Sequence, residues 1–260
     1  MKRLASLFLV LVLIVGTTVA VAEENYTDEM KIPYTVDLSS EDGADSVERA
    51  GDHADSPYFA HPDFYNMTST DTLTILPKFK TQQQTSEWSC GVSSTLMVLN
   101  YFGKLGDYNE ESLAAMRSVG LTSGKGGTEP SSTSLIQVVD MFNGVGGFTL
   151  TTARDYGEDI HDKFTLDAIQ AFLKDNTPIL IGWNDWGGHW QVIIGYDTMG
   201  TETQQDDVII VADPYDTTDH NQDGYGIYPA ERFIYNFTFY NFFNEEDGND
   251  MQFVAAKPAE

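Results

Sequence analysis

The sequence predicts an α+β fold, with an N-terminal helical part packed on an antiparallel β-sheet. Between residues 92 and 174 apolar residues recur at helical spacing. From residue 178 onward they form short β-rich runs separated by Gly, Pro and Asp. Hydrophobic residues make up 41% of the 260 residues and charged residues 21%, which is typical of a globular chain long enough to bury a core. Helices first and strands second are the order of an α+β protein.

The N-terminus has the three parts of a secretory signal peptide. Lys2 and Arg3 precede an apolar run over residues 4–15, and residues 20–22 read Ala-Val-Ala, small side chains of the kind signal peptidase reads. The run is shorter than the ~20 apolar residues that span a bilayer, so we expect a cleaved signal peptide over residues 1–22 rather than an uncleaved anchor. No cysteine follows the run to carry a lipid anchor. The sequence therefore predicts a secreted, extracellular protein with no stable membrane insertion after cleavage.

Residues 23–72 form an acidic leader that is poor in periodic apolar residues. It contains many acidic residues but only two basic ones, Lys31 and Arg49. We expect this leader to be solvated and partly disordered, and a pro-segment that covers a site is the alternative. The formal net charge of the chain is −26, which argues against binding to nucleic acid or to anionic lipid.

Residues 73–260 are expected to form one domain. A short strand over residues 73–77 leads to a polar run, after which apolar side chains recur at helical spacing from Val92 to Phe102, with Gly103 as the helix stop. Further helices are expected over residues 110–118, 132–142 and 166–174. Strands are expected over residues 178–182, 189–196, 208–212, 233–243 and 251–256.

Cys90 is the single cysteine of the sequence and lies at the start of the first predicted helix. The helix dipole and the unpaired N–H groups of the first turn favour an anion there, and a thiol attacks only as thiolate. One cysteine excludes an intramolecular disulfide and any metal site that needs several thiolates. A catalytic nucleophile is the favoured interpretation, and a small buried hydrophobic side chain is the alternative.

His189 is the candidate base for this thiol, because it opens an apolar strand. The other histidines lie in the leader or in polar stretches: His53, His61, His161 and His220.

Two further polar side chains complete the candidate site. Asp213 ends the next predicted strand and can orient the imidazole, although Asp185 or Asn184 could take its place. Gln84, upstream of the cysteine, can donate to the oxyanion of a tetrahedral intermediate.

These motifs resemble the papain-like cysteine peptidases, in particular the bacteriocin-processing branch that removes double-glycine leaders. The resemblance is carried by Gln84-x-x-x-x-x-Cys90-Gly91, by Ser94-x-Leu96-Met97, by His189-Trp190-Gln191-Val192 and by Asp213-Pro214. It covers roughly residues 73–214.

The resemblance implies a papain-like peptidase domain over residues 73–260. It further implies that Cys90 is the nucleophile, His189 the base, Asp213 the orienting acid and Gln84 an oxyanion donor. The long separation of the histidine from the acid implies an inserted turn over residues 197–206. The predicted export suggests that fold and residue chemistry transfer from this branch while the substrate does not.

A second motif resembles half of a calcium-binding loop. Asp219, Asn221 and Asp223 place oxygen ligands at alternate residues, and Gly224 lies at the turn. The bidentate acid of such a loop is missing at Ala230, so an ordinary polar loop is the alternative. Calcium is the one cofactor suggested, and the thiol chemistry requires none.

The sequence thus predicts a monomeric, secreted cysteine peptidase that hydrolyses peptide or protein substrates through a Cys-His-Asp thiolate and an acyl-enzyme. Two alternatives stay open. One is a catalytically inactive, peptidase-like binding or adhesion module. The other is a cell-wall peptide amidase with the same thiol chemistry.

Overall fold

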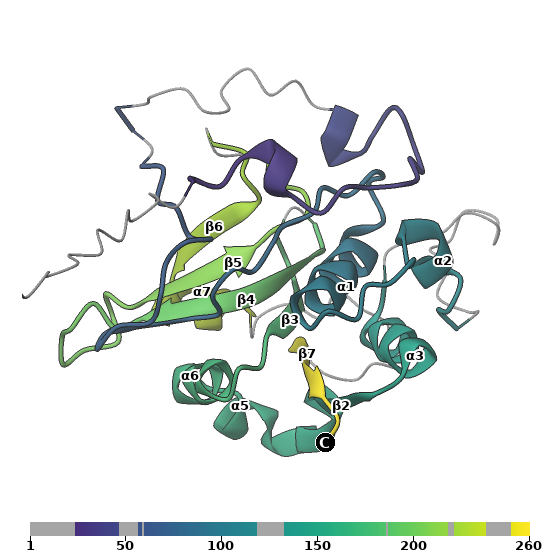
Figure 1. Cartoon of the computed structure of the whole chain (residues 1–260). Coiled ribbons are helices and arrows are strands. Elements are labelled where there is room, and N and C mark those ends of the chain that lie inside the picture. Colours follow the sequence, from purple (N-terminus) through teal and green to yellow (C-terminus); the bar gives the residue numbers. More distant parts are fainter. Residues whose placement is uncertain are drawn as a thin grey trace, which may run out of the picture.

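The computed structural model describes most of the domain and part of the leader (Figure 1). The predicted signal peptide lies outside the described residues, as does the middle of the leader. No helix within the described part is long and apolar enough to cross a membrane. The described residues are 24–46, 57–58, 60–118, 133–185, 187–217, 221–237 and 251–260.

An antiparallel β-sheet forms the centre of the described part. Its strand order is β2-β7-β3-β4-β5-β6, and β1 pairs with β4. Strands β3 and β4 are buried along almost their whole length, which explains why their sequences are continuous apolar runs. The bounds are β1 Leu73–Ile75, β2 Phe148–Thr152, β3 Ile179–Trp183, β4 His189–Asp197, β5 Val208–Ala212, β6 Tyr225–Pro229 and β7 Gln252–Pro258.

Helix α1 is the central helix and packs mainly on β4. Its residues from Cys90 to Leu99 are all buried, so it is apolar or small all round rather than amphipathic. In Figure 1, α1, α2 and α3 lie on one side of the molecule and strands β4, β5 and β6 on the other. The helix bounds are α1 Cys90–Tyr101, α2 Glu110–Ala114, α3 Leu135–Val145, α4 Ala153–Tyr156, α5 Ile160–Lys163, α6 Leu166–Lys174 and α7 Ala230–Phe237, with 3-10 turns η1 Asp28–Met30, η2 Ala44–Ser46 and η3 Gly157–Asp159.

The predicted α+β layout is confirmed, and helix 166–174 and strand 208–212 have the expected bounds. The inserted turn is also present, because β4 ends at Asp197 and β5 begins at Val208. The strand predicted over residues 233–243 is wrong. Residues 230–237 form helix α7, since Phe233 and Phe237, four residues apart, are both buried on one helical face; the rest of that range lies outside the described residues.

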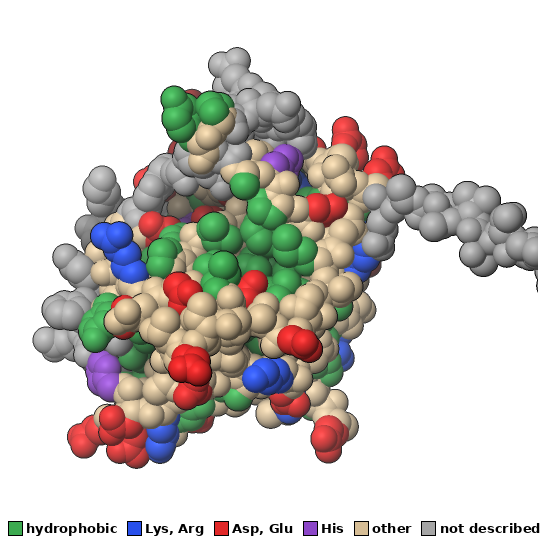
Figure 2. All heavy atoms as spheres, turned by 90° about the vertical axis from the view of Figure 1, so that its left-hand side faces the viewer, with side chains coloured by type: hydrophobic (Ala, Val, Ile, Leu, Met, Phe, Trp, Pro, Cys, Tyr) green, Lys and Arg blue, Asp and Glu red, His purple; other side chains and the backbone are tan. Residues whose placement is uncertain are grey.

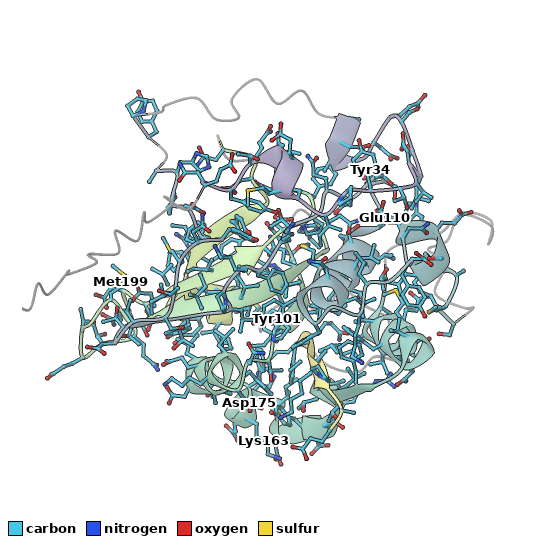
Figure 3. The ribbon with its side chains drawn as sticks, viewed as in Figure 1. Tyr34, Tyr101, Glu110, Lys163, Asp175 and Met199 are labelled. Atoms are coloured by element: carbon cyan, nitrogen blue, oxygen red, sulfur yellow. The ribbon has the colours of Figure 1, made fainter. Side chains whose placement is uncertain are left out.

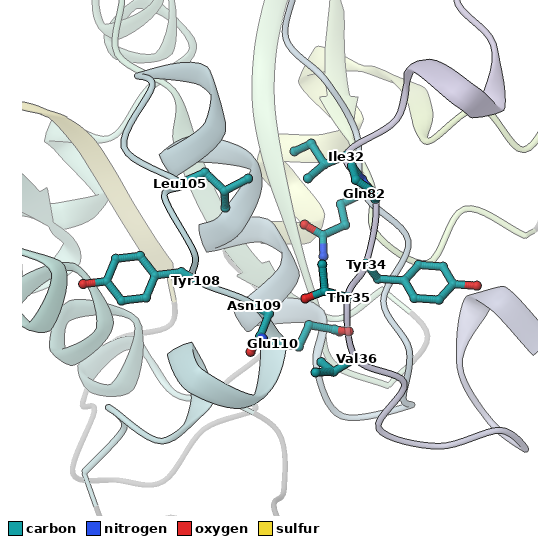
Figure 4. Close-up of a pocket in the computed structure, with 10 residues that line it drawn as sticks. Ile32, Tyr34, Thr35, Val36, Gln82, Leu105, Tyr108, Asn109 and Glu110 are labelled. Atoms are coloured by element: carbon teal, nitrogen blue, oxygen red, sulfur yellow. The ribbon is translucent and has the colours of Figure 1, made fainter.

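Residues 24–46 pack on the domain, which differs from the solvated leader that the composition suggested. Tyr26, Ile32 and Ala44 are buried, and the Ile32 amide donates to the carbonyl of Thr81 at 2.9 Å. Figure 4 shows this segment beside the start of α2, where the two enclose a cavity of only about 20 Å³, room for one water molecule. The segment is therefore part of the folded structure.

The surface reflects the acidic composition. Figure 2 shows one face on which hydrophobic side chains gather at the centre and acidic side chains lie around them. Among the described residues, the exposed large hydrophobic side chains include Ile227 of β6 and Tyr235 of α7.

Candidate active site

The sheet brings His189 and Asp213 together. β4 and β5 are antiparallel neighbours, with Val192 opposite Ala212, so the residue that follows β5 lies opposite Gln191 and diagonal to His189, the first residue of β4. His189 Nε2 lies 2.6 Å from Asp213 Oδ1, and the imidazole is buried. The adjacent ends of β4 and β5 thus bring His189 and Asp213, which are far apart in sequence, into direct contact.

The electrostatics of this pair favour an imidazolium against a carboxylate. Burial alone would lower the pKa of His189, but the Asp213 charge and hydrogen bonds to Asp213 and Cys90 outweigh it, and the pKa is raised well above its ordinary value. Burial likewise opposes the charged form of Asp213, yet His189 and its other hydrogen-bond donors lower the pKa of that carboxyl. Each partner therefore stabilises the charged form of the other.

Cys90 is the first residue of α1 and is buried. Interaction with Cys90 is among the causes that raise the pKa of His189, so the thiol lies within interaction range of the imidazole. The N-terminus of α1 adds a partial positive charge at the sulfur. Gly91 must be glycine here, since a Cβ on it would lie 2.7 Å from the Thr133 Cβ.

Gln191 holds the second oxygen of Asp213. Its Nε2 donates to Asp213 Oδ2 at 2.7 Å, while its Oε1 accepts from the Trp183 indole at 2.9 Å, which fixes the amide orientation. The Tyr215 amide donates to Asp213 Oδ1 at 2.8 Å. The sequence motif includes Gln191 but indicates no role for it, although it follows His189 by two residues on the same face of β4.

Asp185, the alternative orienting acid, lies behind the pair. Its Oδ2 accepts from the Tyr228 hydroxyl at 3.1 Å and from Gln191 Nε2 at 3.3 Å. Burial raises the pKa of Asp185. The acid in direct contact with the imidazole is Asp213, and Asp185 supports the amide that orients it.

Gln84 lies in the loop that leads into α1 and is buried. Its backbone N–H donates to Pro214 at 2.9 Å, which docks this loop on the residue after Asp213. Its side-chain Nε2 donates to the carbonyl of Ser86 at 2.7 Å. The loop that carries the candidate oxyanion donor is thus joined directly to the loop that carries the candidate acid.

Glu110, at the start of α2 (Figure 3), holds this loop against α1. Its buried carboxylate accepts from the amide and the hydroxyl of Thr85, at 3.1 and 2.6 Å, and from the Ser93 hydroxyl at 2.8 Å. One anion with three donors fixes the loop relative to the helix that carries the cysteine. Nothing in the local sequence around Glu110 indicates this role.

Arg117 is a half-buried cation on the helical side of the site. Its Nη1 donates to the Thr133 hydroxyl at 3.0 Å, and its guanidinium lies 4.8 Å from the centre of the Trp88 ring. Burial lowers the pKa of Arg117, and the charge on Cys90 raises it, which places the guanidinium within electrostatic range of the sulfur. The cysteine therefore has a second cationic neighbour besides His189.

The predicted calcium loop is described only in part, because Asp219 lies outside the described residues. Asn221 donates from Nδ2 to Ala60 at 2.8 Å, and Asp223 Oδ2 lies 3.2 Å from His61 Nε2. Both side chains thus have protein partners. Within the described ranges, no group of three or more His, Cys, Asp or Glu side chains could hold a metal ion. The calcium site stays a prediction.

Known protein structures and a protein family are similar to this chain. A Bacillus anthracis protein of known structure, described as a candidate C39-like peptidase, is similar with a TM-score of 0.46 and 15% identity, over 73% of this chain and 100% of its own. None of the curated proteins matches the chain. The family model described as the Peptidase_C39 like family matches residues 77–241, a span that includes Cys90, His189 and Asp213. Since that match covers more than half of the sequence, the chain belongs to the Peptidase_C39 like family.

Proposed function

We propose that this chain is a secreted cysteine peptidase in which Cys90, His189 and Asp213 form the catalytic triad. The observation that carries the proposal is the His189–Asp213 contact of 2.6 Å, with Cys90 at the N-terminus of a buried helix and within interaction range of the same imidazole. A cysteine, a base and an orienting acid in this order are the arrangement that nucleophilic catalysis needs.

In the first half of the reaction, the Cys90 sulfur attacks the carbonyl carbon of the substrate and a tetrahedral intermediate forms. His189 holds the proton of the thiol as an imidazolium and gives it to the nitrogen of the leaving amine. The C–N bond breaks, the amine product leaves, and an acyl group remains on sulfur. Asp213 stabilises the imidazolium and holds its orientation throughout.

In the second half, water attacks the thioester. His189, now neutral, takes a proton from that water and returns it to the sulfur as the acid product leaves. The cycle restores the thiol and the base, and it consumes one water for each peptide bond. All of these steps use side chains of this chain and need no cofactor.

Gln84 is the proposed side-chain donor to the oxyanion. It is buried in the loop that leads to Cys90, and the backbone N–H groups at the start of α1 follow a few residues later in the chain. Two such donors stabilise the charge that develops on the carbonyl oxygen, and loss of one costs a factor of about 10² to 10³ in kcat in well-studied hydrolases. We expect Gln84→Glu to be more damaging than Gln84→Asn, because a carboxylate repels the oxyanion.

Hydrolysis that depends on Cys90 is the test of this proposal. Wild type and Cys90→Ala are incubated with a peptide library and, separately, with purified cell-wall peptides, and products are identified by mass spectrometry. We expect wild type to cleave library peptides, and Cys90→Ala to lose all cleavage while its thermal unfolding is unchanged. Cleavage that survives in Cys90→Ala would contradict the mechanism.

The same experiment separates the alternatives. Cleavage of cell-wall peptides alone would identify an amidase with the same chemistry. No cleavage by wild type, combined with a thiol that reacts only slowly at pH 6, would identify an inactive binding module.

A further inference from the structure

The N-terminal segment reaches the candidate site through Asp42. The Ala44 amide donates to the carbonyl of Gln84 at 2.9 Å, and the Ser39 amide donates to the carbonyl of Thr85 at 3.0 Å. Asp42 lies between these two contacts, and its Oδ1 accepts from the Glu87 amide at 3.2 Å. The segment is therefore hydrogen-bonded along the loop that leads to the cysteine.

One peptide group connects Asp42 to the side chain of Gln84. The N–H of Glu87 and the carbonyl of Ser86 belong to the same peptide unit. Its N–H points to Asp42 Oδ1, and its carbonyl accepts from Gln84 Nε2 at 2.7 Å. A carboxylate at the N–H end polarises the carbonyl and strengthens the bond that holds the Gln84 amide.

Asp42 also contacts the loop that carries the acid. The Tyr215 hydroxyl donates to the Asp42 carbonyl at 3.3 Å, and the Tyr215 amide donates to Asp213 Oδ1. Burial and the neighbouring charges of Glu87 and Asp42 raise the pKa of Tyr215, so the phenol stays a donor. A single residue of the N-terminal segment thus joins the loop before Cys90 to the loop after β5.

From this geometry we propose that Asp42 is a positioning residue for the oxyanion donor Gln84, and that residues 37–46 belong to the working enzyme rather than to a removable pro-segment. The inference rests on the proposed peptidase function and names a residue that acts on it from outside the triad. Asp42 acts through the Ser86–Glu87 peptide, and the hydrogen bonds described above join it to Glu87 and Tyr215 rather than to the thiol or the imidazole.

Three full-length variants test the proposal. Asp42→Ala removes the acceptor for the Glu87 amide, Asp42→Asn keeps an oxygen at that place, and Glu41→Ala removes an equal charge from the neighbouring exposed residue. We expect Asp42→Ala to lower kcat about tenfold with KM changed less than twofold, a part of what loss of an oxyanion donor costs. Asp42→Asn should recover most of the activity, and Glu41→Ala should behave as wild type.

Two further measurements distinguish positioning of Gln84 from general damage. A peptide aldehyde with the sequence of a cleaved substrate forms a tetrahedral adduct and needs the oxyanion donor, whereas iodoacetamide needs only the thiolate. In Asp42→Ala the aldehyde should bind about tenfold more weakly, while the alkylation rate of Cys90 stays within twofold of wild type. Equal losses in both assays, or no loss in either, would overturn the proposal.

A readout without activity keeps this inference separate from the proposed function. The side-chain amide resonances of Gln84, identified by their absence in Gln84→Glu, should shift in Asp42→Ala and return in Asp42→Asn. If wild type cleaves no peptide, the proposed function fails, and these resonances alone decide the inference. Gln84 resonances that stay unchanged in Asp42→Ala would refute the inference. Peptidase activity that rises in Asp42→Ala would also refute it, because an inhibitory pro-segment behaves in that way.

Discussion

Replacing Asp213 by asparagine tests the geometry of the site with a change of a single atom. Both carboxylate oxygens of Asp213 accept hydrogen bonds: Oδ1 from His189 and the Tyr215 amide, and Oδ2 from Gln191. An asparagine has one oxygen, so its NH₂ group must face a donor in either orientation. Gln191 cannot turn to accept from it, because its Oε1 is held by the Trp183 indole.

The magnitude follows from these contacts. The variant loses the charge-assisted bond to His189 and leaves a buried donor without an acceptor, which together cost about 2–3 kcal/mol. At 1.36 kcal/mol for each factor of ten, we expect kcat/KM of Asp213→Asn to fall roughly 30- to 150-fold. The triad geometry predicts that most of this loss appears in kcat, since Asp213 acts on the imidazole and not on the substrate.

Asp185→Asn is the matched control for this experiment. The two donors that reach Asp185, from Tyr228 and Gln191, both point to Oδ2, so an asparagine can keep its oxygen there and turn its NH₂ group away. We expect kcat/KM within about threefold of wild type for a peptide whose cleavage requires Cys90. The assignment of Asp213 as the orienting acid is refuted if Asp213→Asn keeps a third or more of the wild-type kcat/KM. It is also refuted if Asp185→Asn loses as much kcat/KM as Asp213→Asn does.

The remaining predictions concern the surroundings of the triad. Arg117→Gln should slow alkylation of the single cysteine at pH 6 by roughly two- to fivefold, since a partly exposed cation near a thiolate contributes modestly. Arg154→Gln, on α4, which packs against β2 and β7 at the end of the sheet away from β4 and β5, should leave the rate unchanged. Glu110→Gln should lower the free energy of unfolding by about 1–3 kcal/mol in urea titrations. The reason is that the amide and hydroxyl of Thr85 and the hydroxyl of Ser93 donate to both carboxylate oxygens, and a glutamine offers only one oxygen. An unchanged urea midpoint would contradict that reasoning. The His189–Asp213 pair should stabilise the fold in a defined pH window. The raised pKa of His189 contributes stability that is full below its ordinary value of 6.5 and lost as pH rises through the folded value. The lowered pKa of Asp213 contributes stability that is full above 3.8 and lost as pH falls through the folded value. The difference in unfolding free energy between wild type and Asp213→Asn should therefore be largest between about pH 4 and pH 6.5, and a difference independent of pH would contradict the ion pair.

The sequence was sufficient to predict the elements that carry the triad candidates. Cys90, His189 and Asp213 each lie at the end of a predicted helix or strand, where local pattern is strong and a short motif surrounds the residue. The antiparallel order of the strands then brings the two later residues together without any further information.

The supporting contacts could not be predicted in this way. Glu110, Arg117 and Asp42 reach the site across long stretches of sequence, and each acts through a contact that only tertiary packing creates. Composition misled for residues 24–46, because an acidic segment looks solvated even when a few residues such as Tyr26 and Ile32 anchor it. The aromatic residues of the segment suggested a strand where the structure has helix α7. There the helical spacing of the buried side chains outweighs their propensity for strands.

The pH dependence of Cys90 alkylation tests the central claim most directly, because the sequence contains no other thiol. The rate of modification by iodoacetamide is measured from pH 4 to pH 9 on the folded protein, with His189→Ala as the comparison. If the imidazolium of His189 holds the sulfur as a thiolate, the rate at each pH should fall at least tenfold in His189→Ala. Equal rates in the two proteins across the pH range would contradict the account.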